Sequence, residues 1–173
     1  MKNLFRAIQN LLASIEVPNQ GRKALGYVDE DWGQLNMDKP PVKFPCALIS
    51  MADANWEEEG RQTQRGVQAI DIVIAHLPMT PSSAGASDTL KDASLYTMEL
   101  VELIHSKTHG VPPALDGRTW GALSRKKVTK VNRNDGIRAY RILFEVQVFD
   151  DGASPIYEYI TVTPDLPQAG IVQ

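Results

Sequence analysis

The apolar residues between Tyr140 and Val148 fall on every second position, and this alternation constrains the fold more than any other feature of the chain. They are Tyr140, Ile142, Phe144, Val146 and Val148, with Arg141, Glu145 and Gln147 among the residues between them. This period of two is typical of a β-strand that buries one of its faces. The sequence therefore requires a sheet with one covered side.

A partner for this strand precedes it in the chain. Asn134-Asp135-Gly136 supplies residues that accept positive φ in a tight turn, and residues 124–131 place Val128 and Val131 among basic side chains. Two strands joined by such a turn form a β-hairpin.

Two segments show the period of a helix instead. Apolar residues from Leu4 to Ile15 form one stripe, which Pro18 ends, and this predicts a helix over residues 2–16. A second stripe runs from Leu90 to Ile104. Here Ser87 or Asp88 would cap the helix, Gly110 with Pro112 would end it, and its expected range is 88–107.

Two further strands complete the predicted fold. FPCALISM indicates a buried strand over 44–51, and the alternation of Ile70, Ile72 and Ile74 indicates one over 67–77. Together with strands over 121–132 and 137–149, they predict an α+β fold with a mostly antiparallel four- to five-stranded sheet and both helices on one face. We expect one domain over 1–152 and a C-terminal extension or arm over 153–173.

Two segments between these elements carry no clear period. Residues 19–43 are rich in glycine, proline and acidic groups and are expected to form a long surface connection. Residues 57–65 (EEEGRQTQR) are expected to be a solvated loop in which Arg61 and Arg65 neutralise the carboxylates, although a paired-carboxylate site is the alternative.

Composition narrows the classes of function. The 173 residues include 43% hydrophobic and 23% charged residues, and no apolar run approaches the ~20 residues that span a bilayer, so no membrane role is expected. The single cysteine, Cys46, is expected to be a buried small hydrophobe, which suits a reducing cytoplasm. A net charge of −3 gives no general attraction to DNA and favours a protein partner.

The sequence offers no convincing catalytic, metal or cofactor site. His105 and His109 are spaced i, i+4, but two ligands do not make a zinc site, and histidines at a helix C-terminus complement its dipole. The segment PMTPSSAGAS is expected to be a flexible loop that includes Ser82, Ser83 and Gly85. A serine there would lack the rigid support and the base that a nucleophile requires.

Two segments are candidates for a subunit interface. In RKKVTKVNR, strand periodicity places Arg125, Lys127 and Arg133 on one side and Lys126 and Lys130 on the other, which suits an exposed sheet edge or, alternatively, a surface facing DNA in a channel. The tail carries Tyr157, Tyr159 and Ile160 between Pro155 and Pro164. Such an apolar tail is expected to dock as an edge strand or arm on a neighbouring subunit, or else to fold back on its own sheet.

The order of these elements, together with PPVKFPCALISM, GVQAIDIVIAHL, SLYTMELVELIHSK and AYRILFEVQVFDD, resembles the tail-terminator and tail-completion proteins of long-tailed bacteriophages. The resemblance covers residues 1 to about 150, and its cues are patterns rather than chemical motifs. It implies a non-catalytic subunit of the virion neck, made in the cytoplasm of the bacterial host.

The resemblance also implies partners. In that family the subunits form a ring, typically of six, that caps the tail tube and joins the tail to the head. The expected partners are therefore other copies of the chain, the tail-tube protein and a head-completion or connector protein, with DNA passing through the ring. A non-phage binding module and a metal-dependent or hydrolytic enzyme are the alternatives.

Overall fold

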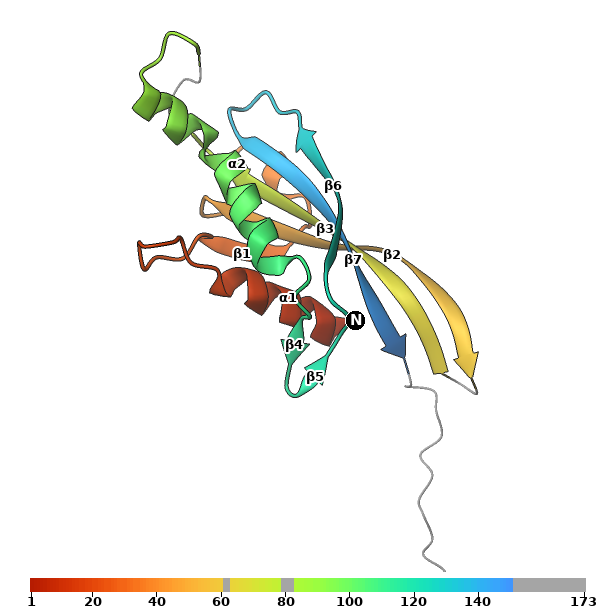
Figure 1. The fold of residues 1–173 in the computed structure, drawn as a ribbon. Helices are drawn as coiled ribbons and strands as arrows, with labels where there is room; N and C mark the ends of the chain where they lie inside the picture. The colour runs from red at the N-terminus through yellow and green to blue at the C-terminus, as the bar shows by residue number, and fades with distance from the viewer. Residues whose placement is uncertain (61–62, 79–82, 151–173) are drawn as a thin grey trace, which may run out of the picture.

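A computed structural model describes residues 1–60, 63–78 and 83–150 of the chain. Its elements are α1 (Lys2–Ser14), β1 (Tyr27–Glu30), the short 3-10 helix η1 (Gln34–Asn36), β2 (Cys46–Gly60), β3 (Thr63–His76), α2 (Asp88–Thr108), β4 (Ala114–Leu115), β5 (Arg118–Thr119), β6 (Ser124–Val131) and β7 (Arg138–Asp150). The fold is α+β, with a five-stranded sheet in the order β1-β2-β3-β7-β6 and a small hairpin of β4 and β5 (Figure 1). The predicted α+β class is confirmed.

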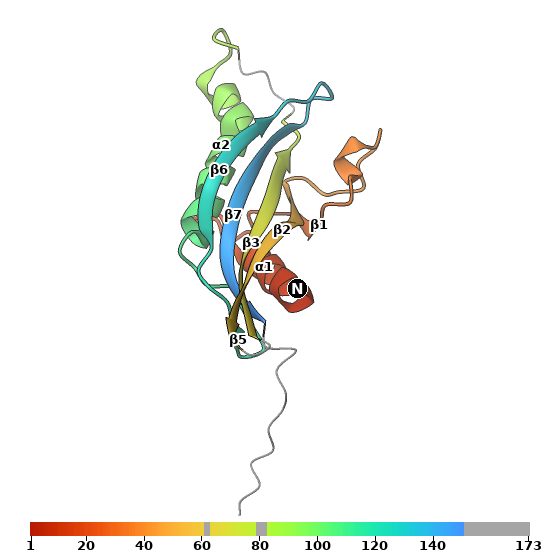
Figure 2. The same cartoon turned by 90° about the vertical axis from the view of Figure 1, so that its right-hand side faces the viewer.

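The sheet itself is mixed rather than antiparallel throughout. β1 runs parallel to β2, with Tyr27 opposite Cys46, whereas the pairs β2-β3, β3-β7 and β6-β7 are antiparallel. A parallel pair needs a connection that crosses back over the sheet. Residues 31–45 provide it, and Figure 2 shows the five strands following one another across the twisted sheet.

One face of the sheet is covered by both helices, as the apolar stripes predict. α1 contributes Leu4, Ile8 and Leu12 to this core, and α2 contributes Leu100, Val101 and Ile104. They pack against side chains that share one face of β2, β3 and β7: Ala47, Ile49, Ile70, Ile72, Ile74, Ile142, Phe144, Val146 and Val148. The alternation from Tyr140 to Val148 thus marks the face that the helices cover.

Within residues 1–60, 63–78 and 83–150, the other face is covered near the start of β2. There Leu35, Val42 and Phe44 pack over Cys46, Leu48 and Val73. The prediction of a simple surface connection over 19–43 is therefore wrong in part, because this segment contains β1 and η1 and buries Leu35 and Gln34. A four-residue edge strand is too short to show a period, and it is held by pairing with β2.

β2 and β3 are longer than predicted and continue as a pair to Gly60 and Thr63. Residues 57–60 and 63–65 are thus strand, and the expected solvated loop over 57–65 is wrong for these positions. Polar residues on both faces hide the period of two, while the pairing still satisfies the backbone. The part of the sheet formed by residues 54–60, 63–68 and 146–150, here called the arm, extends past α1 and lies at the lower right in Figure 1.

A β-bulge separates the arm from the rest of β2. The register with β3 shifts between Met51 and Ala54. Gln68, only 1% exposed, donates from Nε2 to the carbonyl oxygens of Ala52 and Ala69 at 2.6 and 2.7 Å. A bulge leaves backbone groups without ladder partners and bends its strand. Here a buried side-chain amide satisfies the bulged carbonyl of Ala52.

Candidate assembly surfaces

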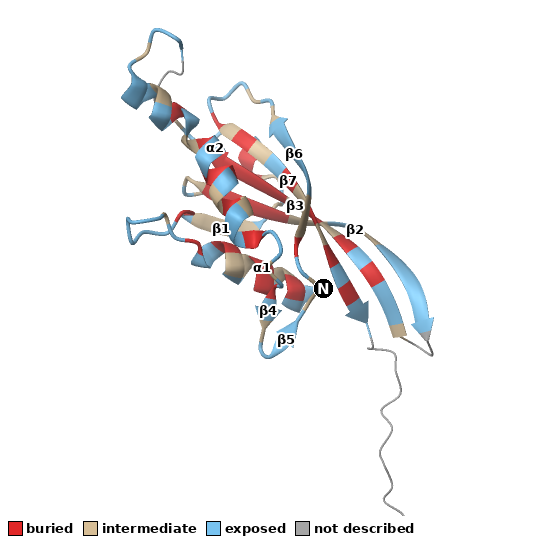
Figure 3. Cartoon of the chain, in the orientation of Figure 1, coloured by how far each residue is buried: buried red, intermediate tan, exposed pale blue. Residues whose placement is uncertain are grey.

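The arm exposes aromatic side chains on both of its faces. Trp56 and Phe149 are 37% and 51% exposed, and Val67 is 38% exposed. Figure 3 shows long exposed stretches on this part of the sheet. Trp56 pairs with Gly66, whose missing side chain leaves room for the indole: a Cβ built on Gly66 would lie 2.7 Å from Trp56 Cε3. Phe149 lies on the opposite face, with the Arg65 guanidinium 5.8 Å from its ring centroid.

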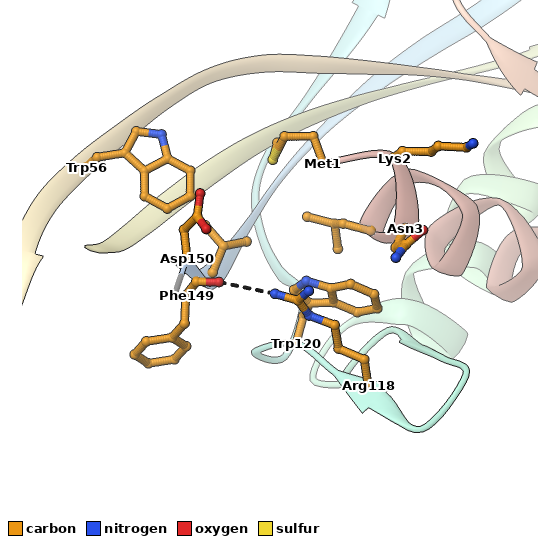
Figure 4. A pocket seen from close by; sticks show the side chains of 10 residues that line it. Met1, Lys2, Asn3, Trp56, Arg118, Trp120, Phe149 and Asp150 are labelled. Carbon is orange, nitrogen blue, oxygen red and sulfur yellow. Dashed lines mark hydrogen bonds between the residues drawn. The ribbon is translucent and has the colours of Figure 1, made fainter. Parts of the chain in front are cut away.

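A hollow of about 390 Å³ lies at the base of the arm, between the start of α1 and β5 (Figure 4). Its walls include Met1, Leu4, Trp56, Trp120 and Val148. Arg118 closes one side, because its guanidinium lies 5.5 Å from the Trp120 ring centroid and donates to the Phe149 carbonyl oxygen at 3.3 Å. The hollow thus combines aromatic and apolar walls with charged and polar side chains at its rim, a mixture typical of protein interfaces.

The predicted basic strand is β6, and it forms one edge of the sheet. Basic residues lie on both of its faces, but the predicted grouping of Arg125 with Lys127 is wrong, because a bulge lies between them. Arg125 pairs with Phe144 and Lys130 with Tyr140, on the helix-covered face, whereas Lys127 pairs with Leu143 on the other face. Lys126, Lys127 and Lys130 are all exposed, and Lys126 Nζ lies 3.1 Å from Glu145.

Arg133 does not join this exposed basic group. It forms an ion pair with Asp135 within the β6-β7 turn and donates to the carbonyl oxygen of Leu35 and to Asn36 Oδ1 in η1. The hydrogen bond from Arg133 lowers the pKa of the Asp135 carboxyl. Arg133 therefore fastens the hairpin turn to the segment that covers the second sheet face, and we interpret it as a structural residue.

The opposite edge of the sheet, β1, is acidic, and sequence reasoning missed it. Asp29 and Glu30 belong to the strand and Asp31 follows it. Asp29 accepts a hydrogen bond of 2.6 Å from the Tyr27 hydroxyl, and this bond raises the pKa of Tyr27. The signal in the sequence is the apolar pair Tyr27-Val28 directly before three acidic residues, which is weak without the structure.

The structure places the rings of His105 and His109 side by side near the end of α2. Their ring centroids are 5.0 Å apart, and His109 Nδ1 accepts a hydrogen bond from the Arg125 backbone N–H at 3.1 Å. Desolvation, with Arg125 and His109 nearby, lowers the pKa of His105. Among the described residues, no group of three or more His, Cys, Asp or Glu side chains is placed to hold a metal ion.

His76 and Tyr96 line a shallow hollow of about 520 Å³ between the end of β3 and α2. Their rings meet edge to face, with centroids 5.3 Å apart. Within the described part of the chain, the buried His76 Nδ1 and Tyr96 hydroxyl have no hydrogen-bond partner. Burial and then the charge of Arg138 lower the pKa of His76, which favours the neutral imidazole.

The remaining predicted positions divide between described and undescribed residues. Ser83 and Gly85 lie in the turn that precedes α2, whereas Ser82 lies outside the described residues. Tyr157, Tyr159 and Ile160 also lie outside them, so the docking of the tail and the division at residue 152 stay predictions. Cys46 is fully buried, as expected, and burial raises its pKa to about 12.

Comparisons with known proteins leave the function open. No family model matches the chain, and no curated protein matches it. A chain from the structure of the virion of a native gene transfer agent (GTA) particle has a TM-score of 0.45 and 10% sequence identity, over 71% of this chain and 78% of that one. No conclusion about function follows from a likeness of this size.

The helices were also compared with the requirements of a membrane span. Within the described residues, neither α1 nor α2 combines the length and the apolar character that crossing a bilayer requires.

Proposed function

We propose that the chain is a structural subunit of the neck of a bacteriophage or prophage particle. Copies of it associate as a ring that caps the tail tube and joins the tail to the head, with no catalytic role and no cofactor. The observation that carries the proposal is the arm, which extends past the helices and exposes Trp56 and Phe149.

The arm supports an assembly role because of what its side chains are. Aromatic residues dominate the energy of protein interfaces when a partner covers them, and each buries 150–250 Å² in general. Trp56 and Phe149 lie on opposite faces of the arm. A neighbouring subunit or a tail protein that contacted both faces would cover both side chains. A stable interface buries about 800 Å² on each partner, so a partner that covers these aromatic residues must also cover much of the arm around them.

The neck location rests on the resemblance of the element order to tail-terminator and tail-completion proteins. The partners proposed on that basis are other copies of the chain, the tail-tube protein, a head-completion or connector protein, and DNA passing through the ring. The protein would be made in the host cytoplasm and retained in the virion. A protein-binding module outside phages would also use the arm, but it would not need contact between copies.

The test is complementation of a producing strain that lacks the gene. Wild-type protein is expected to restore joined heads and tails in electron micrographs, and the variant Trp56→Ser/Phe149→Ser is expected to leave them separate. Met98→Ser is the matched control, since Met98 is also exposed, at 48%, but lies on α2. Thermal melts establish that each variant folds.

Two results would contradict the proposal. One is normal particles in the strain that lacks the gene, and the other is absence of the protein from purified particles. Truncation after Gly152 is a separate test of the predicted tail: a folded domain that no longer joins tails of normal length to heads is expected.

A further inference from the structure

Part of the basic edge of the sheet has no charge partner among the described residues. Within the described residues, neither Lys127 nor Lys130 forms an ion pair, and both are exposed on β6. The start of this edge is covered where the Arg125 N–H donates to His109. From Lys126 onward the edge strand is exposed up to Lys130.

The acidic edge, on the far side of the sheet, also has side chains without ion pairs among the described residues. In the described chain, Asp29, Glu30 and Asp31 form no ion pair. The backbone of β1 is partly used already, because the Val28 and Glu30 carbonyl oxygens accept hydrogen bonds from Gln9 and Gln34. A partner would therefore meet this edge through side chains rather than by adding a long strand.

One copy cannot bring its two edges together. β1 and β6 are separated by three strands of the same sheet, so at about 4.8 Å per strand they lie roughly 20 Å apart. This distance exceeds the Debye length of about 8 Å at physiological salt, and the two edges face in opposite directions. Their attraction is available only between molecules.

We propose that copies of the chain associate head to tail, with Lys127 and Lys130 of one copy against Asp29 and Glu30 of the next. This inference deepens the proposed ring and rests on it for its biological setting. A contact between two different edges is heterologous, so each copy keeps one free edge of each kind, and repetition closes a ring or extends a filament. The two edges thereby define the direction in which subunits follow one another.

Cysteine cross-linking tests the contact with the edge charges intact. The variant Thr129→Cys/Trp32→Cys places one thiol on exposed β6 and one beside the acidic edge, where Trp32 is 53% exposed. Thr129→Cys/Met98→Cys is the matched control, since Met98 is 48% exposed on α2. The native Cys46 is buried, and its raised pKa keeps it unreactive.

Head-to-tail contact predicts a ladder of disulfide-linked oligomers longer than dimers, at a yield roughly tenfold above the control, or ~1.4 kcal/mol. The yield should fall several-fold in high salt, because exposed charges are screened. Adding Lys127→Glu/Lys130→Glu should suppress the ladder, and adding Asp29→Lys/Glu30→Lys to that chain should restore it. Recovery by the swapped charges excludes misfolding as the cause of the loss.

A ladder no longer than that of the control overturns the inference, and so does a ladder that survives reversal of the basic edge alone. The edge is assigned to DNA instead if the Thr129→Cys/Trp32→Cys variant gives no ladder and Lys127→Glu/Lys130→Glu abolishes its binding to a double-stranded DNA oligonucleotide. A different result contradicts the proposed neck role, namely normal particles from the strain that lacks the gene.

Discussion

Replacing Gly66 with alanine tests whether the Trp56 indole lies across the arm. A Cβ at position 66 would lie 2.7 Å and 2.9 Å from Trp56 Cε3 and Cδ2 and 3.0 Å from the Asn55 carbonyl oxygen. These distances are too short for carbon, so the ring or the strand must move. Overpacking of this kind costs about 1–3 kcal/mol.

An opposing effect sets the net magnitude. Where the backbone tolerates it, alanine stabilises relative to glycine by about 0.4–1 kcal/mol, because it reduces the freedom of the unfolded chain. We therefore expect Gly66→Ala to lower the free energy of unfolding by roughly 1–2 kcal/mol. In a Trp56→Ala background the ring contact is absent, and the same change should be close to neutral.

Urea unfolding of the four proteins in this double-mutant cycle gives the coupling energy between the two positions. A coupling of about 1 kcal/mol or more is expected for residues in contact. An equal effect of Gly66→Ala in both backgrounds would show that the indole does not contact the new Cβ. A stabilising effect in the wild type would show that the indole moves away without a cost in free energy.

Three further predictions concern other parts of the chain. Leu100→Ala should cost about 2–5 kcal/mol in urea unfolding, since Leu100 is 1% exposed in the helix-covered core, and a negligible change would contradict that packing. His105→Ala and His109→Ala should each leave the zinc content of the purified protein at background, and stoichiometric zinc that either change removes would refute this. His109→Ala should also lower the free energy of unfolding by about 0.5–1.5 kcal/mol, because it removes the hydrogen bond from the Arg125 N–H. The lowered pKa of His76 means that the unfolded chain binds its proton more readily, so stability should fall as pH drops below the ordinary value of 6.5, and His76→Gln should flatten that part of the pH profile of the melting temperature.

The sequence predicts those elements in which apolar residues recur with the period of a helix or a strand. Leu100 and Ile104 mark the buried stripe of α2, and Ile70, Ile72 and Ile74 mark the helix-covered face of β3, because these apolar residues recur with the period of a helix and of a strand. The same alternation assigns the helix-covered face of the sheet correctly. Local pattern suffices where one face is apolar and the other is polar.

The other features of the fold and of the candidate surfaces depend on contacts between residues that are distant in the sequence, which a local pattern does not reveal. β1 exists because β2 pairs with it, and the β2 and β3 segments of the arm carry polar residues on both faces. One bulge after Arg125 reverses the face of Lys127, which no alternation rule foresees. The acidic edge emerges only once the order of strands is known, because Asp29 and Lys127 are far apart in the sequence.

Gln68 has a consequence for the geometry of any closed assembly. Its amide holds the bulged Ala52 carbonyl at the point where the arm leaves the covered part of the sheet. The angle at which the arm leaves the covered part of the sheet sets where a protein bound to Trp56 and Phe149 would sit on each copy. One buried glutamine would then fix the position of that contact in every copy of a ring, and Gln68→Leu, which keeps the bulk but loses both donors, would displace it.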